Sequence, residues 1–204
     1  MNFQIFNQNQ VLLLPLVKQF KKEFYLVGGT AIALHIGHRR SIDFDLFKYS
    51  AINPRSILQV VSDFEYPYSV TRRVTEQLNV TVNDVKFTFF QFPFKIEAKE
   101  KLEDVLRLPN LLDLAAMKAY ALGRRSKWKD YVDLYFILKD HYTIQQISDR
   151  TIALFGQLFS EKLFRAQLSY FDDIDYSESV EFLVQPVPDK EIKDYLTDIA
   201  TDIF

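Results

Sequence analysis

The chain has 204 residues, of which 48% are hydrophobic and 15% aromatic, and its formal net charge is −2. This composition excludes a disordered chain and gives no global attraction to nucleic acid or anionic membrane, while the length allows one compact domain or two small ones. Because the sequence has no cysteine, disulfide frameworks and cysteine-bound zinc are also excluded.

The first residues of the chain predict neither a targeting signal nor a membrane span. The segment MNFQIFNQNQ lacks the basic start and the small-residue cleavage site of a signal peptide. The apolar run VLLLPLV is far shorter than the roughly 20 residues that a membrane-spanning helix needs. We therefore expect a cytoplasmic protein without a membrane partner.

Short strands and helices alternate in the first half of the chain. Asn53 and Pro54 predict a helix start, because Asn caps helices and Pro suits the first helical position. The pair Asn83-Asp84 between two apolar runs predicts a hairpin with a two-residue turn. The predicted elements are a helix over 11–23, in which Pro15 lies near the start or forms a kink, a strand over 24–27, a helix over 30–36, a strand over 41–47, a helix over 53–64 and a hairpin over 76–92.

From about residue 100 the apolar residues recur at helical spacing. Predicted caps separate the helices at Asn110, at Ser126 and at Thr143, where Gln146 completes a capping box. Residues 189–204 form a last amphipathic pattern. The sequence therefore predicts an α+β fold, with a mixed first half and a helical second half.

Gly28, Gly29 and Thr30 stand between the first predicted strand and the following helix. Glycine lets a phosphate approach the backbone closely, and the free N–H groups of a helix start point at it. Thr30 either caps the helix or offers its hydroxyl to a phosphate oxygen. The alternative is that the two glycines only form a tight turn.

Asp43 and Asp45 alternate with apolar residues in the second predicted strand. Both aspartates therefore share one face, with Cα atoms about 6.6 Å apart, while Ile42, Phe44 and Leu46 face the core. Two such carboxylates suit a hard divalent cation such as Mg²⁺. The alternative is a solvated strand edge.

The combined string LVGGTAIALHIGHRRSIDFDLF, residues 26–47, is more specific than either half. Twelve residues separate Gly28-Gly29-Thr30 from Asp43-Phe44-Asp45, and this combination resembles the nucleotidyltransferase superfamily of DNA polymerase β. The string is similar to the AbiEii/AbiGii toxin-like branch, which residues 111–138, LLDLAAMKAYALGRRSKWKDYVDLYFIL, also resemble. The resemblance implies a polymerase β-like core with a small mixed sheet and flanking helices over 1–105. A helical region over 106–204 would complete the active site.

This resemblance implies a Mg²⁺-dependent nucleotidyltransferase that moves a nucleoside monophosphate from a nucleoside triphosphate to a hydroxyl acceptor on tRNA or protein. It further implies the toxin of a toxin–antitoxin or phage-defence system, with a cognate antitoxin as partner. Asp43 and Asp45 would be catalytic and hold Mg²⁺, and the backbone at Gly28, Gly29 and Thr30 would cradle the triphosphate.

Three further site residues are implied. Arg39 would contact a phosphate or pair with the aspartates, with a structural ion pair as the alternative. Lys118 would contact a phosphate, whereas spacing alone predicts an exposed helix lysine. Asp130 would act as general base or complete the acidic cluster, whereas spacing alone makes Asp130 and Asp133 solvated acids near a helix start.

One feature departs from the superfamily, which usually has a third carboxylate on a neighbouring strand. The candidate strand VKFTFFQF, residues 85–92, contains no acid. Either Asp130 carries the role of base, or the site is degraded. The alternative function is therefore a catalytically inactive scaffold of the same fold that binds nucleotide or a partner.

The segment GRRSKWK, residues 123–129, concentrates positive charge. Arg124, Arg125, Lys127 and Lys129 predict contacts with the backbone of an RNA acceptor, and Trp128 predicts stacking on a base. The alternative is a solvated helix junction. Acidic residues gather in the 170s and either shield the site or meet a basic partner; they are Asp172, Asp173, Asp175, Glu178 and Glu181.

Overall fold

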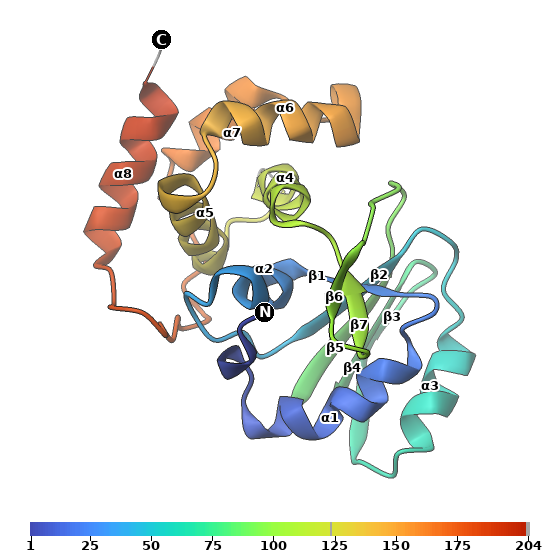
Figure 1. Ribbon diagram of the computed structural model, residues 1–204. Coiled ribbons are helices and arrows are strands. Elements are labelled where there is room, and N and C mark those ends of the chain that lie inside the picture. Colours follow the sequence, from blue (N-terminus) through green and yellow to red (C-terminus); the bar gives the residue numbers. More distant parts are fainter. Residues whose placement is uncertain (123, 203–204) are drawn as a thin grey trace. The chain divides into compact units, whose positions relative to one another are not determined.

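The computed structural model describes residues 1–122 and 124–202, and the chain divides into two compact units. The first unit is Met1–Asn110, and the second begins at Leu111. Each unit is a continuous stretch of chain and can be followed by its colours in Figure 1. The predicted assignment of catalytic roles to residues 1–105 and 106–204 stays a prediction.

A seven-stranded sheet in the order β3-β4-β5-β2-β1-β7-β6 forms the first unit (Figure 1). The strands are β1 (Tyr25–Val27), β2 (Phe44–Lys48), β3 (Tyr68–Arg73), β4 (Gln77–Val82), β5 (Val85–Gln91), β6 (Glu100–Leu102) and β7 (Leu106–Leu108). Strand β2 is antiparallel to β1 and parallel to β5, so the sheet is mixed. The predicted α+β class is confirmed.

The helices of this unit follow local sequence signals. They are the 3₁₀ turn η1 (Phe3–Ile5), α1 (Gln8–Gln19), α2 (Gly28–Ile36) and α3 (Pro54–Ser62). Helix α1 starts three residues before the predicted residue 11, because Asn7 and Gln10 form a capping box, and Pro15 lies inside the helix. The predicted start of α3 is confirmed, since the Asn53 side chain accepts hydrogen bonds from the first-turn N–H groups.

One face of the sheet is the core of the first unit. Leu26, Leu46 and Phe89 are fully buried there. Phe20, which follows α1, packs on Phe89 with ring centroids 4.8 Å apart. On the opposite face, the Asp45 side chain is half-buried. Ile42 was predicted to face the core but is 50% exposed, because β2 begins only at Phe44 and the strand alternation does not reach residue 42.

The predicted hairpin is β4 and β5, and its turn has the geometry that the sequence indicates. Asn83 and Asp84 have φ angles of 45° and 63°. Two successive positive φ angles are typical of the type I′ turn, which matches the twist of the flanking strands. The turn also fixes the register of β4 and β5, in which Val82 pairs with Val85.

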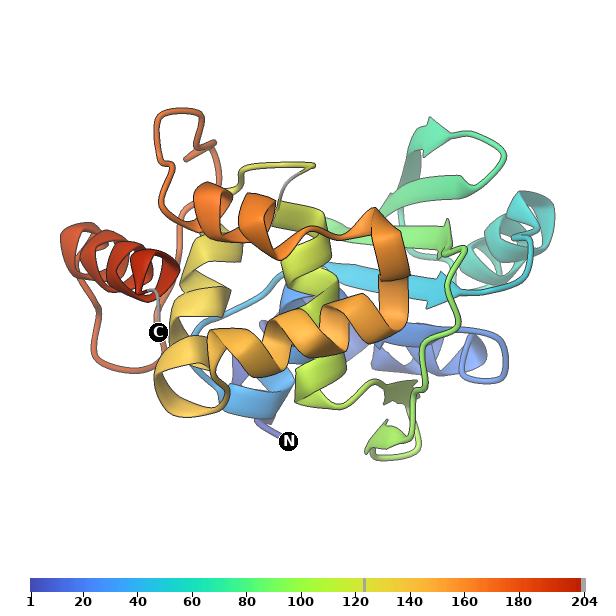
Figure 2. The same cartoon turned by 90° about the horizontal axis from the view of Figure 1, so that it is seen from above.

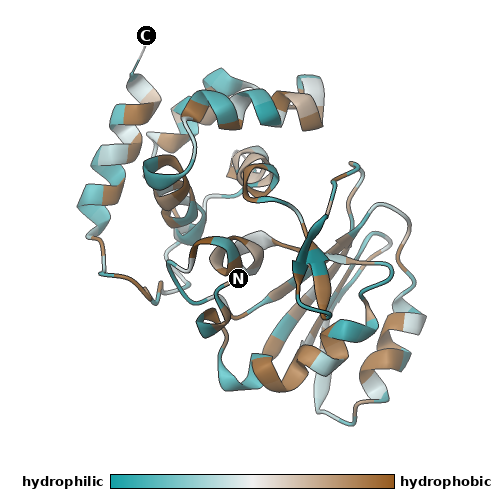
Figure 3. Ribbon diagram, viewed as in Figure 1, coloured by the Kyte–Doolittle hydropathy of each residue, from teal (hydrophilic) through white to brown (hydrophobic). Residues whose placement is uncertain are grey.

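The second unit is helical. Its elements are α4 (Leu111–Leu122), α5 (Trp128–Asp140), α6 (Ile144–Phe155), the 3₁₀ turn η2 (Gly156–Leu158), α7 (Glu161–Leu168) and α8 (Asp189–Thr201). Figure 2 shows α6 crossing α4, with which it is in contact. Figure 3 shows polar and apolar residues alternating along α8, which buries Ile192 and Leu196.

Helix ends in this unit test the predicted caps. The Thr143–Gln146 capping box is confirmed at the start of α6. Ser126 does not cap α5, which begins one residue later than that cap requires. Residues 203 and 204 of the predicted last helix lie outside the described residues. Among helices in the described ranges, none is long and apolar enough to cross a membrane.

Candidate active site

The two glycines at the start of α2 allow two charged side chains to approach the backbone. Gly28 has a φ of +72°, and a Cβ placed on it would overlap the carboxylate of Asp45. A Cβ placed on Gly29 would overlap the guanidinium of Arg39. The two glycines therefore let other groups come close to the backbone. The groups that do so here are the side chains of an acid and a cation of the chain itself.

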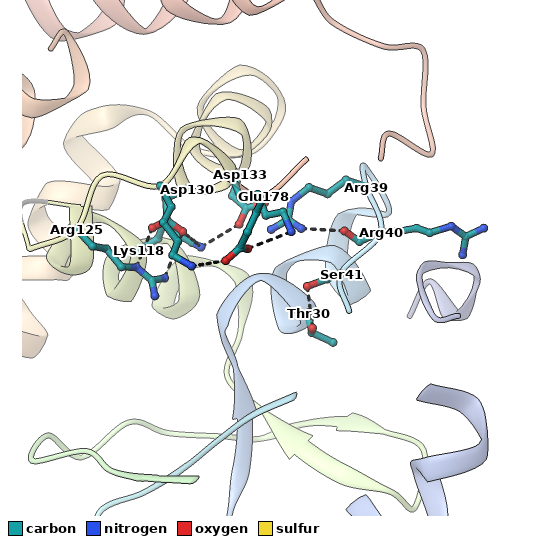
Figure 4. Close-up of polar contacts among 11 residues, drawn as sticks. Thr30, Arg39, Arg40, Ser41, Lys118, Arg125, Asp130, Asp133 and Glu178 are labelled. Atoms are coloured by element: carbon teal, nitrogen blue, oxygen red, sulfur yellow. Dashed lines mark hydrogen bonds and ion pairs between the residues drawn. The ribbon is translucent and has the colours of Figure 1, made fainter. Parts of the chain in front are cut away.

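Thr30 is buried in the first turn of α2 and ties this turn to the residues before β2. Its hydroxyl donates to the carbonyl oxygen of Asp43 and lies 2.9 Å from the hydroxyl of Ser41, as Figure 4 shows for Ser41. The expectation that Thr30 caps α2 is wrong, because the helix starts at Gly28 and Val27 occupies the cap position. The hydroxyl instead fixes the position of Asp43.

Asp43 and Asp45 lie at the start of β2. Asp43 directly precedes the strand, and both side chains are half-buried. In the sheet Asp45 pairs with Val27 on β1 and with Thr88 on β5. Because directly paired residues present their side chains on the same face, Thr88 occupies the place beside Asp45 where a third carboxylate would be expected.

The donor set at this position fits a substrate-associated Mg²⁺ ion. Among the residues that the structure describes, no group of three or more His, Cys, Asp or Glu side chains could hold a metal ion. Mg²⁺ usually keeps several waters and binds one or two carboxylates together with substrate phosphates. Asp43 and Asp45 supply two carboxylates, the number that fits such a Mg²⁺ ion.

Arginines 39 and 40 have separate roles in the first unit. Arg39 is buried, and its Nη1 donates to the carbonyl oxygen of Arg40 at 2.8 Å. Arg40 donates to the carbonyl oxygens of Gln4 and Phe6 at 3.1 and 3.2 Å, so it holds the N-terminal segment. Arg39, against Gly29, is the arginine that lies at the start of α2.

In the second unit, Lys118 lies between two carboxylates. Its Nζ is 2.7 Å from Oδ1 of Asp130 and 2.9 Å from Oδ2 of Asp133. Arg125 Nε donates to Oδ2 of Asp130 at 2.9 Å. These four residues form the Lys118 cluster and are labelled in Figure 4. Lys118, Asp130 and Asp133 are buried, so the expectations of an exposed lysine and of solvated helix acids are wrong.

This cluster keeps Lys118 charged although it is buried. Burial by itself lowers the pKa of Lys118, but the carboxylates of Asp130 and Asp133 outweigh burial and raise the pKa above its ordinary value of 10.5. The partners of Lys118 are at least 12 residues further along the chain. The pattern of residues around Lys118 in its own helix therefore could not predict these ion pairs. Asp130 and Asp133, one turn apart on α5, were the available signal.

The basic segment after α4 is engaged within the second unit. Arg124 stacks on Tyr120, with the guanidinium carbon 3.7 Å from the ring centroid, and Lys127 and Lys129 pair with Glu178. Trp128 is 5% exposed, so the prediction of an available stacking surface is wrong in this conformation. Gly123, which opens the segment, lies outside the described residues.

Comparisons with known proteins agree with the fold. The chain is 26% identical over 186 residues to an uncharacterized protein of Aquifex aeolicus, covering 85% of this chain and 88% of that protein. The solved structures that are similar to this chain include the following two. MenT4, a nucleotidyltransferase toxin from Mycobacterium tuberculosis, has a TM-score of 0.61 at 14% identity and covers 95% of this chain and 83% of its own. JHP933 from Helicobacter pylori has a TM-score of 0.57 at 16% identity and covers 98% and 91%.

At these identities the two structures show a shared fold, and the predicted polymerase β-like nucleotidyltransferase fold is confirmed. The family model described as "Nucleotidyl transferase AbiEii toxin, Type IV TA system" matches residues 63–203. This region begins after Asp45 and includes Lys118 and Asp130, so it is independent of the glycine and aspartate motifs. The chain belongs to the AbiEii nucleotidyltransferase toxin family.

Proposed function

We propose that this nucleotidyltransferase uses Mg²⁺ to move a nucleoside monophosphate from a nucleoside triphosphate to a hydroxyl group, with tRNA as the acceptor. The observation that carries the proposal is the start of α2, where Asp45 packs against Gly28 and Arg39 against Gly29. A helix N-terminus, a cation and the Asp45 carboxylate thus lie together in the first unit, and Thr30 holds the backbone of Asp43 beside them. Such a set suits a triphosphate and its metal ion.

The roles of these residues follow from their charges. The backbone N–H groups at Gly28, Gly29 and Thr30 would donate to triphosphate oxygens, and Arg39 would neutralise part of their charge. Asp43 and Asp45 would hold Mg²⁺. The ion, when bound, supplies further neutralisation of the charge on the phosphate groups.

The proposed reaction balances without an added oxidant or reductant. The acceptor hydroxyl oxygen forms a bond to the α-phosphorus, and the bond from that phosphorus to the oxygen bridging to the β-phosphate breaks. Pyrophosphate leaves with the electron pair, and the hydroxyl proton passes to a base. The protein acts mainly by positioning these groups and by stabilising their charge.

Lys118 and Asp130 are proposed as the contribution of the second unit. Lys118 would contact a phosphate while its two carboxylate partners keep it charged. Asp130 accepts hydrogen bonds from Lys118 and Arg125, so it would have to release one cation before it could take a proton. Its role as base therefore stays a prediction, and orientation of Lys118 is the role that its contacts support.

The test is an incubation with Mg²⁺, each α-labelled nucleoside triphosphate in turn, and total tRNA. We expect label in RNA with wild type and a loss of roughly 10²- to 10³-fold with Asp45→Asn, the size found when one preorganised electrostatic group is removed. Asp84→Asn is the matched control, because Asp84 lies in the β4–β5 turn and Asn also tolerates its positive φ. This control should keep wild-type activity.

Two other results would change the proposal. Label in the protein itself would keep the transferase and replace tRNA by a protein acceptor. Nucleotide binding without any transfer of label would support the inactive scaffold instead. The AbiEii family is described as part of a type IV toxin–antitoxin system. We propose a cognate antitoxin as a protein partner and the cytoplasm, where triphosphates are used, as the site of action.

A further inference from the structure

A long segment without helix or strand connects α7 to α8. It runs from residue 169 to residue 188, about 20 residues, between Leu168 and Asp189. Loops longer than about 12–15 residues without regular structure are uncommon in compact domains and are usually functional. Because it carries the acidic residues of the 170s, we name residues 169–188 the acidic strap. Figures 1 and 2 show it as an extended trace before α8.

The acidic strap lies on the basic segment that precedes α5. The Glu178 carboxylate pairs with Lys127 through one oxygen and with Lys129, at 3.2 Å, through the other. The Ser126 hydroxyl donates to Oδ2 of Asp173 at 2.9 Å. Acidic groups of the strap thus lie against two cations and a hydroxyl, which are the groups that would meet RNA phosphates.

The backbone and one ring of the acidic strap also cover Trp128. The backbone N–H of Trp128 donates to the Asp175 carbonyl oxygen at 3.1 Å. The backbone N–H of Asp175 donates to the Ser126 carbonyl oxygen at 2.8 Å. Tyr176 packs on Trp128 with ring centroids 5.4 Å apart. Trp128 is consequently buried although it begins a helix next to a basic segment.

We propose that the acidic strap is an autoinhibitory cover over an RNA-binding segment, with the Glu178 carboxylate in the place of an RNA phosphate between Lys127 and Lys129. The acceptor RNA displaces the strap, takes over the two lysines and exposes Trp128 for stacking on a base. This regulation rests on the proposed function, because it takes RNA as the acceptor.

The ion pairs of the strap with Lys127 and Lys129 are of a kind that a polyanion displaces. The side chains of Lys127 and Glu178 are 34% and 36% exposed, and ion pairs with that exposure are weak and screened by salt. One main-chain contact between the strap and the basic segment is the isolated bridge of Lys127 with Asp175. An RNA presents many phosphates and gains affinity by releasing its counterions, whereas the strap presents one carboxylate to the two lysines.

Trp128 is the only tryptophan in the sequence, so its fluorescence reports whether the strap covers it. The test compares wild type with Glu178→Gln and with the control Asp194→Asn. The control makes the same charge change at an exposed pair with Lys190 on α8. Without RNA, we expect Glu178→Gln to increase acrylamide quenching of Trp128, while wild type and the control remain alike.

RNA binding is then measured with total tRNA as the probe, together with amide hydrogen exchange at Trp128 and Asp175. We expect Glu178→Gln to bind tRNA about two- to fivefold more tightly, the range that loss of one exposed ion pair gives, and Asp194→Asn to bind as wild type does. Saturating tRNA should speed exchange at both amides in wild type, because the bridge opens.

The outcomes separate this proposal from the proposed function. Unchanged quenching in Glu178→Gln, or tRNA binding that leaves amide exchange unchanged, would overturn the autoinhibitory strap. Binding of a protein partner but not of tRNA would also overturn it, even if label from a triphosphate reaches that protein. If tRNA opens the strap but no label is transferred, the strap proposal holds and nucleotidyl transfer to RNA is wrong.

Discussion

Gly28 and Gly29 illustrate how much depends on single residues. A side chain at Gly28 meets the carboxylate of Asp45, and one at Gly29 meets the guanidinium of Arg39. Glycine is needed for the positive φ at Gly28 and for the space that the acid occupies. The sequence showed the pair of glycines and the spacing to the aspartates, but not which side chains fill the space.

Gly28→Ala should therefore be destabilising and should displace Asp45. The left-handed backbone costs about 1–2 kcal/mol, and crowding adds about 1–3 kcal/mol. Gly37→Ala is the control, because Gly37 has a φ of +70° and a Cβ added there meets the Asn2 side chain at 2.9 Å, compared with 2.2 Å to Asp45 at Gly28. Urea unfolding should give the larger loss for Gly28→Ala, whereas equal losses would show that Asp45 does not fill this space.

Lys118 is the residue whose removal should cost the most stability in the second unit. Lys118→Met leaves Asp130 and Asp133 buried without this cation, and breaking such a buried pair costs about 3–5 kcal/mol. Lys139→Met, at a half-exposed lysine 3.8 Å from Glu191, should cost less than about 1 kcal/mol. Similar free energies of unfolding for both variants would contradict a structural role for the Lys118 cluster.

The raised pKa of Lys118 sets the direction of its pH dependence. Its stabilisation is fully present below the ordinary lysine pKa of 10.5 and is lost as the pH rises through the higher pKa of the folded state. Wild type should therefore keep its advantage over Lys118→Met through neutral pH and lose it only in strong alkali. Unfolding measured between neutral and alkaline pH checks this sign.

At the scale of elements, the sequence predicted the helix caps and turns that depend on a few neighbouring residues. The cap at Asn53, the turn at Asn83-Asp84 and the capping box at Thr143 are each confirmed within a few residues. Strand β3 was missed because all its residues are exposed, which removes the alternation that marks a strand. The remaining missed strands, β6 and β7, have three residues each, too few for a periodic pattern.

Burial in the second unit depends on residues far apart in the sequence and could not be predicted. Trp128 is covered by Tyr176, and Lys118 is enclosed by acids of the next helix. The predicted acidic residues of the 170s had two open interpretations, shielding or a basic partner. Asp173 and Glu178 contact Ser126 and Lys127 of the chain's own basic segment, and the two interpretations stay predictions.

The acidic strap should respond to acid. Burial raises the pKa of Glu178, but hydrogen bonds from Lys127 and Lys129 outweigh burial and lower it from 4.5 to about 2. Asp175 also faces Lys127, and its pKa is lowered by hydrogen bonds from Ser177. A depressed carboxyl pKa stabilises the fold above the ordinary pKa, and this contribution is lost as the pH falls from about 4.5 toward 2.

Acrylamide quenching of Trp128 should therefore rise through this window in wild type, before circular dichroism reports loss of helix. Glu178→Gln lacks the titrating group and should show high quenching throughout. Identical titrations of the two proteins would mean that Glu178 does not hold the acidic strap over Trp128.

At the scale of the whole molecule, the chain has the nucleotidyltransferase fold and belongs to the AbiEii toxin family. The roles of its site residues are proposals, and binding and turnover measurements test them. Two carboxylates without a third nearby acid on β5 predict that metal binding depends on nucleotide. Calorimetry should show weak Mg²⁺ binding to the protein alone and much tighter binding with a non-hydrolysable triphosphate. Equally tight binding without nucleotide would contradict this donor set.

The most direct measurement of the central claim follows label and pyrophosphate together. Wild type, the double variant Asp43→Asn/Asp45→Asn and the control Asp84→Asn are each mixed with Mg²⁺, α-labelled triphosphate and tRNA. We expect one pyrophosphate released for each label joined to RNA by wild type and the control, and neither product from the double variant. Equal label transfer by the double variant would contradict the assignment of the two aspartates as the catalytic metal ligands.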